Sequence, residues 1–224
     1  SLASGINFID TAEMYPTCPL REETTGDTEV IIGNWIEKNK SKRADFILAT
    51  KISGKGYKAV RNGKGIDEKS IKIAIEGSLK KLKTDYIDLY QLHWPNRGSY
   101  HFRQNWNYNP TNQDTDLVKD NINGVLNALS DLQKEGKIRH IGLSNETCWG
   151  ASQFLAPLKN FSNLTIASIQ NEYSLLCRLY DLDMAEMSHH ENISLLSYSP
   201  LAGGFLTGKY INDNVPDNSR LSRV

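Results

Sequence analysis

The sequence predicts an α/β protein with the architecture of a (β/α)8 TIM barrel, of which about six βα units are present. Short apolar runs of strand length alternate with longer segments of helical period, as in repeated βα units on a parallel sheet. Polar or ionisable residues recur at the C-terminal ends of successive predicted strands, which is where a TIM barrel builds its active site. No GxGxxG motif follows any of these strands, which argues against a doubly wound dinucleotide-binding sheet.

The predicted strands are short and strongly apolar. They lie at Ile6–Asp10, Phe46–Lys51, Tyr86–Leu92, Ile138–Ser144, Ala167–Gln170 and Ser194–Tyr198. Residues 46–49 form a continuous apolar run, which is typical of a strand buried on both faces. Such strands belong either in the wall of a barrel or in the middle of a doubly wound sheet.

Helical periodicity predicts the segments that separate the strands. These helices lie at about Glu29–Asn39, Glu68–Lys83, Val118–Lys134, Trp149–Asn160 and Asp181–His190. Asp67 is expected as the N-cap of one helix, and Gly136 lies just past the end of another. Residues 1–5 resemble the last turn of a helix that is closed by Gly5.

Six strands do not close an eight-stranded barrel. We therefore expect residues 1–224 to form a single, partial barrel domain that lacks one βα unit at each end. The least regular segment is Pro95–Asp116, a long polar and aromatic loop. Loops of this length without structure of their own are usually lids or disordered segments, and both interpretations stay open.

Composition narrows the class of protein. Lysine and arginine total 26, the same number as aspartate and glutamate, so no net charge favours nucleic acid or an anionic membrane surface as a partner. The three cysteines are widely spaced and form no CxxC pair, which favours idle thiols in a reducing cytoplasm. Because no membrane helix or signal peptide is recognised, we expect a soluble cytoplasmic protein. The sequence does not indicate its oligomeric state.

Four ionisable residues are expected to meet at the mouth of the barrel. Asp10, Lys51 and His93 follow or end three consecutive strands, and Tyr15 follows Asp10 by five residues. A cation beside a tyrosine favours the phenolate, so Lys51 is expected to lower the pKa of Tyr15 while Asp10 fixes the ammonium. Such a set protonates a carbonyl oxygen as hydride arrives at carbon, and His93 is suited to hold that oxygen.

Three motifs, in this order along the chain, resemble the aldo-keto reductase family. Residues 5–15 (GINFIDTAEMY) look like the family signature, residues 47–51 (ILATK) like its lysine strand, and residues 86–95 (YIDLYQLHWP) like its histidine strand. The resemblance covers nearly the whole chain and is closest to the bacterial Tas-like branch. The family's first and last βα units are not in this sequence.

The resemblance implies a reductase that transfers hydride from NADPH to an aldehyde or ketone. Its catalytic residues would be Asp10, Tyr15, Lys51 and His93, with Tyr15 as the general acid. The cofactor would be held by Ser144, Asn145 and Gln170 at the carboxamide, by Tyr198 on the nicotinamide ring, by Ser199, Leu201 and Gly203 around the pyrophosphate, and by Lys209 and Arg220 at the phosphates. Small residues between 199 and 209 let backbone amides approach phosphate.

The sequence says less about the preferred cofactor and the substrate than about the class of reaction. The missing last unit supplies most of the 2′-phosphate site in the family, so the preference for NADPH over NADH rests on the resemblance alone. Trp94 and Trp149 are candidates for an apolar pocket that takes a small-molecule carbonyl substrate. Trp149 fits a packing role at the start of its helix equally well, and Lys209 alone also fits a solvated loop lysine.

Two other functions stay open. Lys51, at the end of a barrel strand, is also placed for a Schiff base in a lyase. The resemblance extends to the potassium-channel β subunits, which implies a cofactor-binding, redox-sensing regulatory subunit as an alternative. A metal-dependent hydrolase is not favoured, because His93 is the single histidine at a predicted strand end.

Overall fold

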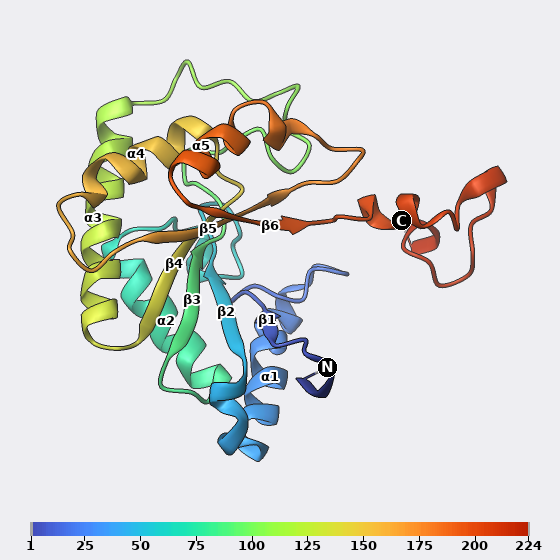
Figure 1. Ribbon diagram of the computed structural model, residues 1–224, viewed down its shortest axis with the longest axis horizontal. Helices are drawn as coiled ribbons and strands as arrows, with labels where there is room; N and C mark the ends of the chain where they lie inside the picture. Colours follow the sequence, from blue (N-terminus) through green and yellow to red (C-terminus); the bar gives the residue numbers. More distant parts are fainter. Residues whose placement is uncertain (1, 224) are drawn as a thin grey trace.

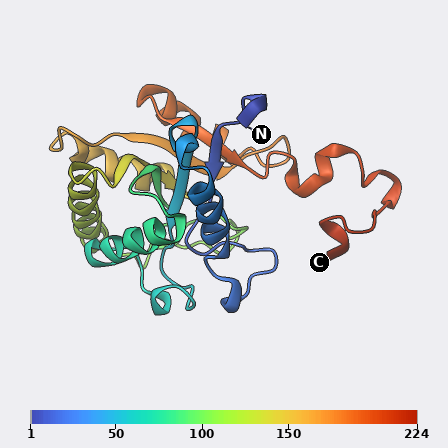
Figure 2. The same cartoon turned by 90° about the horizontal axis from the view of Figure 1, so that it is seen from below.

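The computed structural model describes residues 2–223, which are organised around one parallel sheet. Its strands are β1 (Phe8–Asp10), β2 (Ile47–Ile52), β3 (Ile87–Leu92), β4 (Ile138–Ser144), β5 (Ile166–Glu172) and β6 (Ser194–Tyr198). They are hydrogen-bonded in chain order, and every neighbouring pair is parallel. Figures 1 and 2 show the sheet curling, with the helices on its outer side. The fold is an incomplete (β/α)8 barrel, as the sequence predicts.

The helices follow the strands in alternation. Within the described residues they are α1 (Asp27–Lys38), α2 (Glu68–Leu82), α3 (Thr115–Lys134), α4 (Cys148–Leu158) and α5 (Met184–His190). Three of them have a side-chain N-cap: Asp67 on α2, Asp114 on α3 and Thr147 on α4. Each of these side chains accepts a hydrogen bond from a backbone N–H of the first turn, which a helix cannot satisfy internally.

The element predictions are confirmed, and the differences at the ends have local causes. Helix α3 begins at Thr115 rather than at Val118, because Asp114 caps it earlier than the apolar period suggests. Asp181 belongs to a separate 3-10 turn, so α5 begins only at Met184. The capping role of Asp67 is confirmed.

The two predicted glycine positions are also confirmed. Gly136 has a φ of 74° just after α3. Gly5 has a φ of 79° and closes a 3-10 turn at Leu2–Ser4 by donating its N–H to Leu2 O. Ser1, the other end of that predicted turn, lies outside the described residues.

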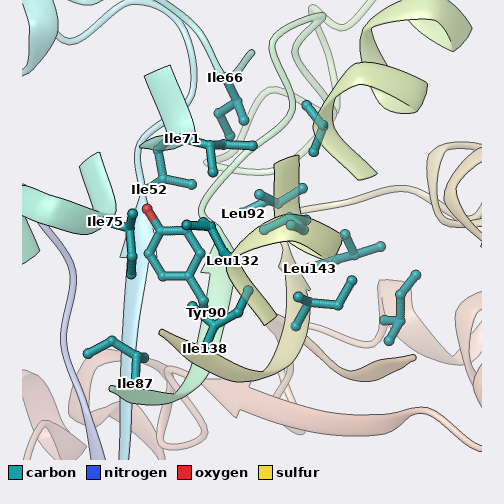
Figure 3. Close-up of a cluster of buried hydrophobic side chains, with 14 of the residues drawn as sticks. Ile52, Ile66, Ile71, Ile75, Ile87, Tyr90, Leu92, Leu132, Ile138 and Leu143 are labelled. Atoms are coloured by element: carbon teal, nitrogen blue, oxygen red, sulfur yellow. The ribbon is translucent and has the colours of Figure 1, made fainter. Parts of the chain in front are cut away.

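The outer side of the sheet is apolar and carries the main core. Tyr90 and Leu92 of β3 belong to one buried cluster with Ile71 and Ile75 of α2, and Figure 3 shows these side chains together. Burial of each such side chain stabilises the fold by about 1.5–3 kcal/mol relative to exposure. The cluster therefore fixes α2 and α3 against the sheet.

The inner side of the sheet is polar. Lys51 of β2, Gln91 of β3 and Gln170 of β5 all donate hydrogen bonds to the Asp10 carboxylate at the end of β1. Side chains alternate between the two faces of a strand, so these residues share one face while their neighbours fill the core. All six residues of β3 are buried, so both faces of this central strand are covered.

The two edges of the sheet are β1 and β6, which are not paired with each other. Side chains near the β1 edge, among them Ile6 and Phe8, are exposed. The segment that follows β6, drawn in red in Figures 1 and 2, extends away from the sheet and the helices. Among the described residues, no helix is long and apolar enough to cross a membrane.

A buried ion-pair cluster lies at the N-terminal end of β3. Asp88 accepts from Arg43 at 2.7 Å, from Arg139 at 2.8 Å and from the Leu48 N–H at 3.0 Å. Both guanidinium groups lie over the Tyr86 ring. The ring centroid is 3.9 Å from Arg43 Cζ and 4.0 Å from Arg139 Cζ. The cluster therefore joins β2, β3, β4 and the turn before β2.

Asp88→Ala is expected to lower the free energy of unfolding by about 3 kcal/mol, because it leaves the buried Arg43 guanidinium without its carboxylate. Urea denaturation followed by circular dichroism measures the change. The control is Glu68→Ala, which removes an exposed pair with Lys72 and is expected to cost less than about 0.5 kcal/mol. Equal effects of the two substitutions would contradict a structural role for Asp88.

Candidate active site

The ends of the first two strands bring a buried ion pair together. Lys51 Nζ donates to Asp10 Oδ2 at 2.5 Å and to the Thr11 carbonyl at 2.8 Å. The Lys51 side chain is fully buried, whereas that of Asp10 is 29% exposed. A buried ammonium is stable only with such partners, so Asp10 and the Thr11 carbonyl hold the Lys51 charge at the ends of these strands.

Tyr15 reaches this pair through an extension of β1. The Thr11 N–H donates to Ala49 O and the Glu13 N–H to Lys51 O, so residues 11–13 continue alongside β2. The Tyr15 carbonyl then accepts the N–H groups of Gly26 and Thr28 at the start of α1. These bonds hold the Tyr15 ring with its centroid 5.1 Å from Lys51 Nζ.

His93 completes the predicted set of four. It follows β3 directly, and its N–H donates to the Ile52 carbonyl at the end of β2. Its ring centroid lies 5.6 Å from that of Tyr15 in an edge-to-face arrangement. The structure therefore brings Asp10, Tyr15, Lys51 and His93 to one place at the carboxyl ends of β1, β2 and β3.

The predicted effect on Tyr15 is wrong. Burial, and then the negative charge of Asp10, raise the pKa of Tyr15 to about 12 instead of lowering it. The reason is that Asp10 neutralises the Lys51 ammonium, which leaves desolvation of the phenolate as the larger effect. Tyr15 accordingly keeps its proton throughout the neutral range.

Burial also sets the charge states of the other two bases. It lowers the pKa of Lys51, while the Asp10 carboxylate acts in the opposite direction. It lowers the pKa of His93 well below its usual value, and the positive charge of Lys51 adds to the shift. His93 is therefore a neutral imidazole near pH 7, and its buried Nδ1 has no hydrogen-bond partner within residues 2–223.

Two contributors to this site were missed by the sequence reasoning. Gln91 Nε2 donates to Asp10 Oδ1 at 2.8 Å, and the signal for it was its position two residues before His93, on the same face of β3. Glu13 is buried and accepts from the Ser53 N–H at 2.5 Å and from Arg61. Because Arg61 lies in a distant loop, nothing in the sequence pairs it with Glu13.

The residues predicted at the nicotinamide carboxamide form a second cluster beside the first. Ser144 Oγ donates to the Gln170 carbonyl at 2.8 Å, and Gln170 Nε2 donates to Asp10 at 3.3 Å. Asn145 Nδ2 donates to the His93 carbonyl at 2.9 Å, and Asn145 Oδ1 accepts the Tyr198 hydroxyl at 2.7 Å. The cluster carries the amide and hydroxyl groups that suit a carboxamide, next to Asp10 and His93.

The predicted phosphate residues lie in the segment after β6, apart from the four catalytic candidates. Gly203 and Gly204 both have positive φ, and a Cβ on Gly204 would lie 2.7 Å from Lys209 Cε. A Cβ on Gly203 would lie 3.9 Å from Arg220 Cδ. Lys209 and Arg220 thus each pass beside one glycine of this pair, and their role at a phosphate stays a prediction. Ser199 and Leu201 begin this segment, and Leu201 is exposed.

The two tryptophans occupy different positions. The Trp94 ring lies 4.8 Å from that of His93, and its Nε1 donates to Lys55 O. The Trp149 ring lies 5.2 Å from the Arg97 guanidinium at the start of α4 and is 42% exposed. Trp94 therefore borders the site, whereas a substrate-binding role for Trp149 stays a prediction.

The fold and the gathering of ionisable side chains define a barrel protein whose site lies at the carboxyl ends of its strands. The sequence model of the "Aldo/keto reductase family" matches residues 1–223. The chain therefore belongs to the aldo/keto reductase family, as the three motifs indicate.

Individual relatives agree with this assignment. The chain is similar to the Tas protein of Escherichia coli, with 42% identity over 98% of this chain and 63% of that protein. It is 39% identical to an aldo-keto reductase of Babesia bovis over 77% of this chain and 64% of that protein. It is 29% identical to the NADH-specific methylglyoxal reductase of Escherichia coli over 98% of this chain and 60% of that protein. The chain spans less than two thirds of the length of these relatives.

The charge state of His93 predicts a pH dependence of stability. Since its pKa is lower in the folded than in the unfolded state, the unfolded chain binds more protons below pH ~6.5, and stability falls as the pH drops. The loss is up to about 1.4 kcal/mol per pH unit in that window. Urea denaturation at pH 7.5 and 5.5 measures it.

Comparison with variants isolates this contribution. His93→Gln is expected to lose less stability than the unsubstituted protein over the same interval. His101, whose pKa is also lowered by burial, contributes in the same direction in both proteins. The control is the exposed His140→Gln, which is expected to keep the full loss. An identical pH dependence in His93→Gln would contradict a buried neutral His93.

Proposed function

We propose that this protein is an oxidoreductase that reduces an aldehyde or ketone to an alcohol, with a nicotinamide dinucleotide as the hydride donor and Tyr15 as the proton donor. The observation that carries the proposal is the position of Tyr15, whose ring lies near both the buried Lys51 ammonium and the neutral His93 imidazole. Membership of the aldo/keto reductase family supports the same reaction class.

His93 and Tyr15 have different roles in the reduction of a carbonyl group. The neutral His93 ring donates one hydrogen bond and so orients the carbonyl oxygen toward Tyr15. A bound nicotinamide cofactor would supply the hydride to the carbonyl carbon. Tyr15 donates its proton to the oxygen as negative charge develops there, because an alkoxide is a far stronger base than the phenolate of even this tyrosine.

The chain also has groups that suit the cofactor itself. Ser144, Asn145 and Gln170 would hold the carboxamide, and Tyr198 would lie against the nicotinamide ring. The Gly203–Gly204 turn, with Lys209 and Arg220 beside it, would hold the pyrophosphate. We propose NADPH as the preferred form, and one of the relatives is named as NADH-specific, so both forms belong in the first titration.

The geometry does not favour the Schiff-base alternative. Two Lys51 N–H groups are engaged by Asp10 and the Thr11 carbonyl, so the nitrogen is held as an ammonium rather than presented as a nucleophile.

Tyr15→Phe is expected to lower the rate of carbonyl reduction by about 100-fold or more, because it removes the general acid and leaves the ring packing in place. An activated aromatic aldehyde and NADPH serve as substrates, and nicotinamide absorbance follows the reaction. Titration by nicotinamide fluorescence is expected to give the same NADPH affinity as in the unsubstituted protein. Reduction at the unsubstituted rate would exclude Tyr15 as the proton donor.

Lys209→Met and Arg220→Met are each expected to weaken NADPH binding by about fivefold or more, because each removes a charge-assisted contact to phosphate. Nicotinamide fluorescence titrations at low and high salt measure the effect, which is expected to shrink as salt rises. The control is Lys72→Met on the exposed face of α2, which is expected to leave the affinity unchanged. Unchanged NADPH affinity in both test variants would contradict the proposal that Lys209 and Arg220 bind the phosphates.

A further inference from the structure

The main chain leaves the sheet between β1 and Tyr15, and a buried carboxylate lies at that point. Residues 11–13 continue beside β2 in the register of β1, and the Glu13 N–H donates to Lys51 O at 3.1 Å. In a regular parallel ladder with this register, the Ser53 N–H would donate to the main-chain carbonyl of Glu13. It donates instead to the Glu13 carboxylate, at 2.5 Å. The carboxylate therefore replaces a backbone acceptor, and the main chain is free to turn away from β2.

A tight turn follows and carries Tyr15. The Tyr15 N–H donates to the Ala12 carbonyl at 3.0 Å, so Glu13 lies inside this turn. The turn holds the Tyr15 ring with its centroid 5.1 Å from Lys51 Nζ. Because Glu13 belongs to the turn, a shift of its carboxylate away from the end of β2 would move the Tyr15 ring as well.

Arg61 holds the Glu13 carboxylate in place. One of its terminal nitrogens donates to Glu13, and the other donates to the Ser53 carbonyl at 2.7 Å. The Glu13 and Arg61 side chains are only 7% and 10% exposed. Burial raises the pKa of Glu13, and the guanidinium acts in the opposite direction. Since a buried carboxylate without a cation is costly, Arg61 stabilises both the position and the charge of Glu13.

The loop that carries Arg61 packs on the same segment. Val60 belongs to a small apolar cluster with Ala12 and Met14, and the Tyr15 ring packs against this cluster. Arg61 itself has a φ of 46°, a left-handed conformation that is unfavourable for a residue with a side chain. Such a conformation persists only where surrounding contacts hold it. The loop after β2 and the turn before Tyr15 therefore form one packed unit, joined by the ion pair.

We propose that Glu13 and Arg61 are positioning residues for Tyr15: as a pair they fix the turn that carries its ring, and so hold its hydroxyl where a carbonyl oxygen is protonated. Both act through Tyr15, and neither contacts the reacting atoms. The effect of the pair on the reaction rate rests on the proposed function of Tyr15. Its effect on the position of the ring does not depend on any activity.

The first test observes the ring without cofactor or substrate. In the full chain, with its tyrosine and histidine rings isotope-labelled, nuclear Overhauser effects are expected between the rings of Tyr15 and His93, whose centroids lie 5.6 Å apart. Tyr15→Phe identifies these signals. Arg61→Met is expected to weaken them at least about threefold, as a displacement of about 1 Å would. The rings of Tyr100 and His101, 4.6 Å apart, provide an unchanged reference in the same spectrum.

Three further variants separate positioning from a general loss of stability. Glu13→Gln removes the charge that Arg61 pairs with, keeps the volume, and is expected to weaken the same signals, which keeps the test valid if Arg61→Met folds poorly. Arg61→Lys keeps the cation and is expected to restore most of their intensity. The matched control is Arg43→Met, because Arg43 is also 10% exposed and pairs with a buried carboxylate, that of Asp88, at the other end of the sheet. It is expected to leave the Tyr15 signals unchanged.

The second test measures the reaction. With saturating NADPH and an activated aromatic aldehyde, Arg61→Met and Glu13→Gln are expected to lower kcat by about tenfold or more, because the proton donor is misplaced. NADPH affinity is expected to stay unchanged, since neither side chain belongs to the proposed cofactor site. Arg61→Lys is expected to recover most of the lost rate, and Arg43→Met is expected to keep the unsubstituted kcat.

Unchanged Tyr15–His93 signals in both Arg61→Met and Glu13→Gln would overturn the proposal. So would an equal weakening in Arg43→Met, or an unchanged kcat in both test variants of an active protein. If the unsubstituted protein reduces no carbonyl compound, the proposed function fails, and the comparison of ring signals still decides whether the pair positions Tyr15.

Discussion

The buried charge of Lys51 is the constraint on which the site depends. An ammonium without access to water is stable only when acceptors surround it, and here Asp10 and the Thr11 carbonyl supply them. The same Asp10 carboxylate accepts Gln91 and Gln170, so one acidic group joins β1, β2, β3 and β5 on the inner face of the sheet. These hydrogen bonds hold four strands at fixed positions around one carboxylate. The polar interior and the barrel shape therefore support each other.

The alternation of side chains along each strand divides the molecule into two environments. Residues facing the helices form the apolar core, whereas their neighbours form the polar interior beside Asp10. This explains how β3 and the residue after it carry Gln91 and His93 on one side and Tyr90 and Leu92 on the other.

The segment after β4 is held from several directions. Asn145 adopts a left-handed conformation with a φ of 52°, and its carbonyl accepts Ser99 Oγ at 2.9 Å. The next carbonyl, that of Glu146, accepts His101 Nε2 at 3.1 Å. The loop between β3 and α3 is thus anchored to the backbone that carries the predicted carboxamide residue. By contrast, Lys209 and Arg220 lie in a segment that extends from the sheet, so the catalytic candidates are assembled without the phosphate residues.

The sequence by itself determined the elements and the strand-end residues Asp10, Lys51 and His93 of the candidate site. Apolar runs, helical periods and caps such as Asp67 depend on residues close by in the chain, so they can be predicted from the sequence alone. Strand ends also placed Asp10, Lys51 and His93 together, because parallel strands share one carboxyl edge. Only the tertiary structure decided the pairing of Glu13 with Arg61, of Arg97 with Glu146, and the direction of the Tyr15 pKa shift. Those depend on burial and on which charge lies nearest, and both are set by contacts between residues far apart in the chain.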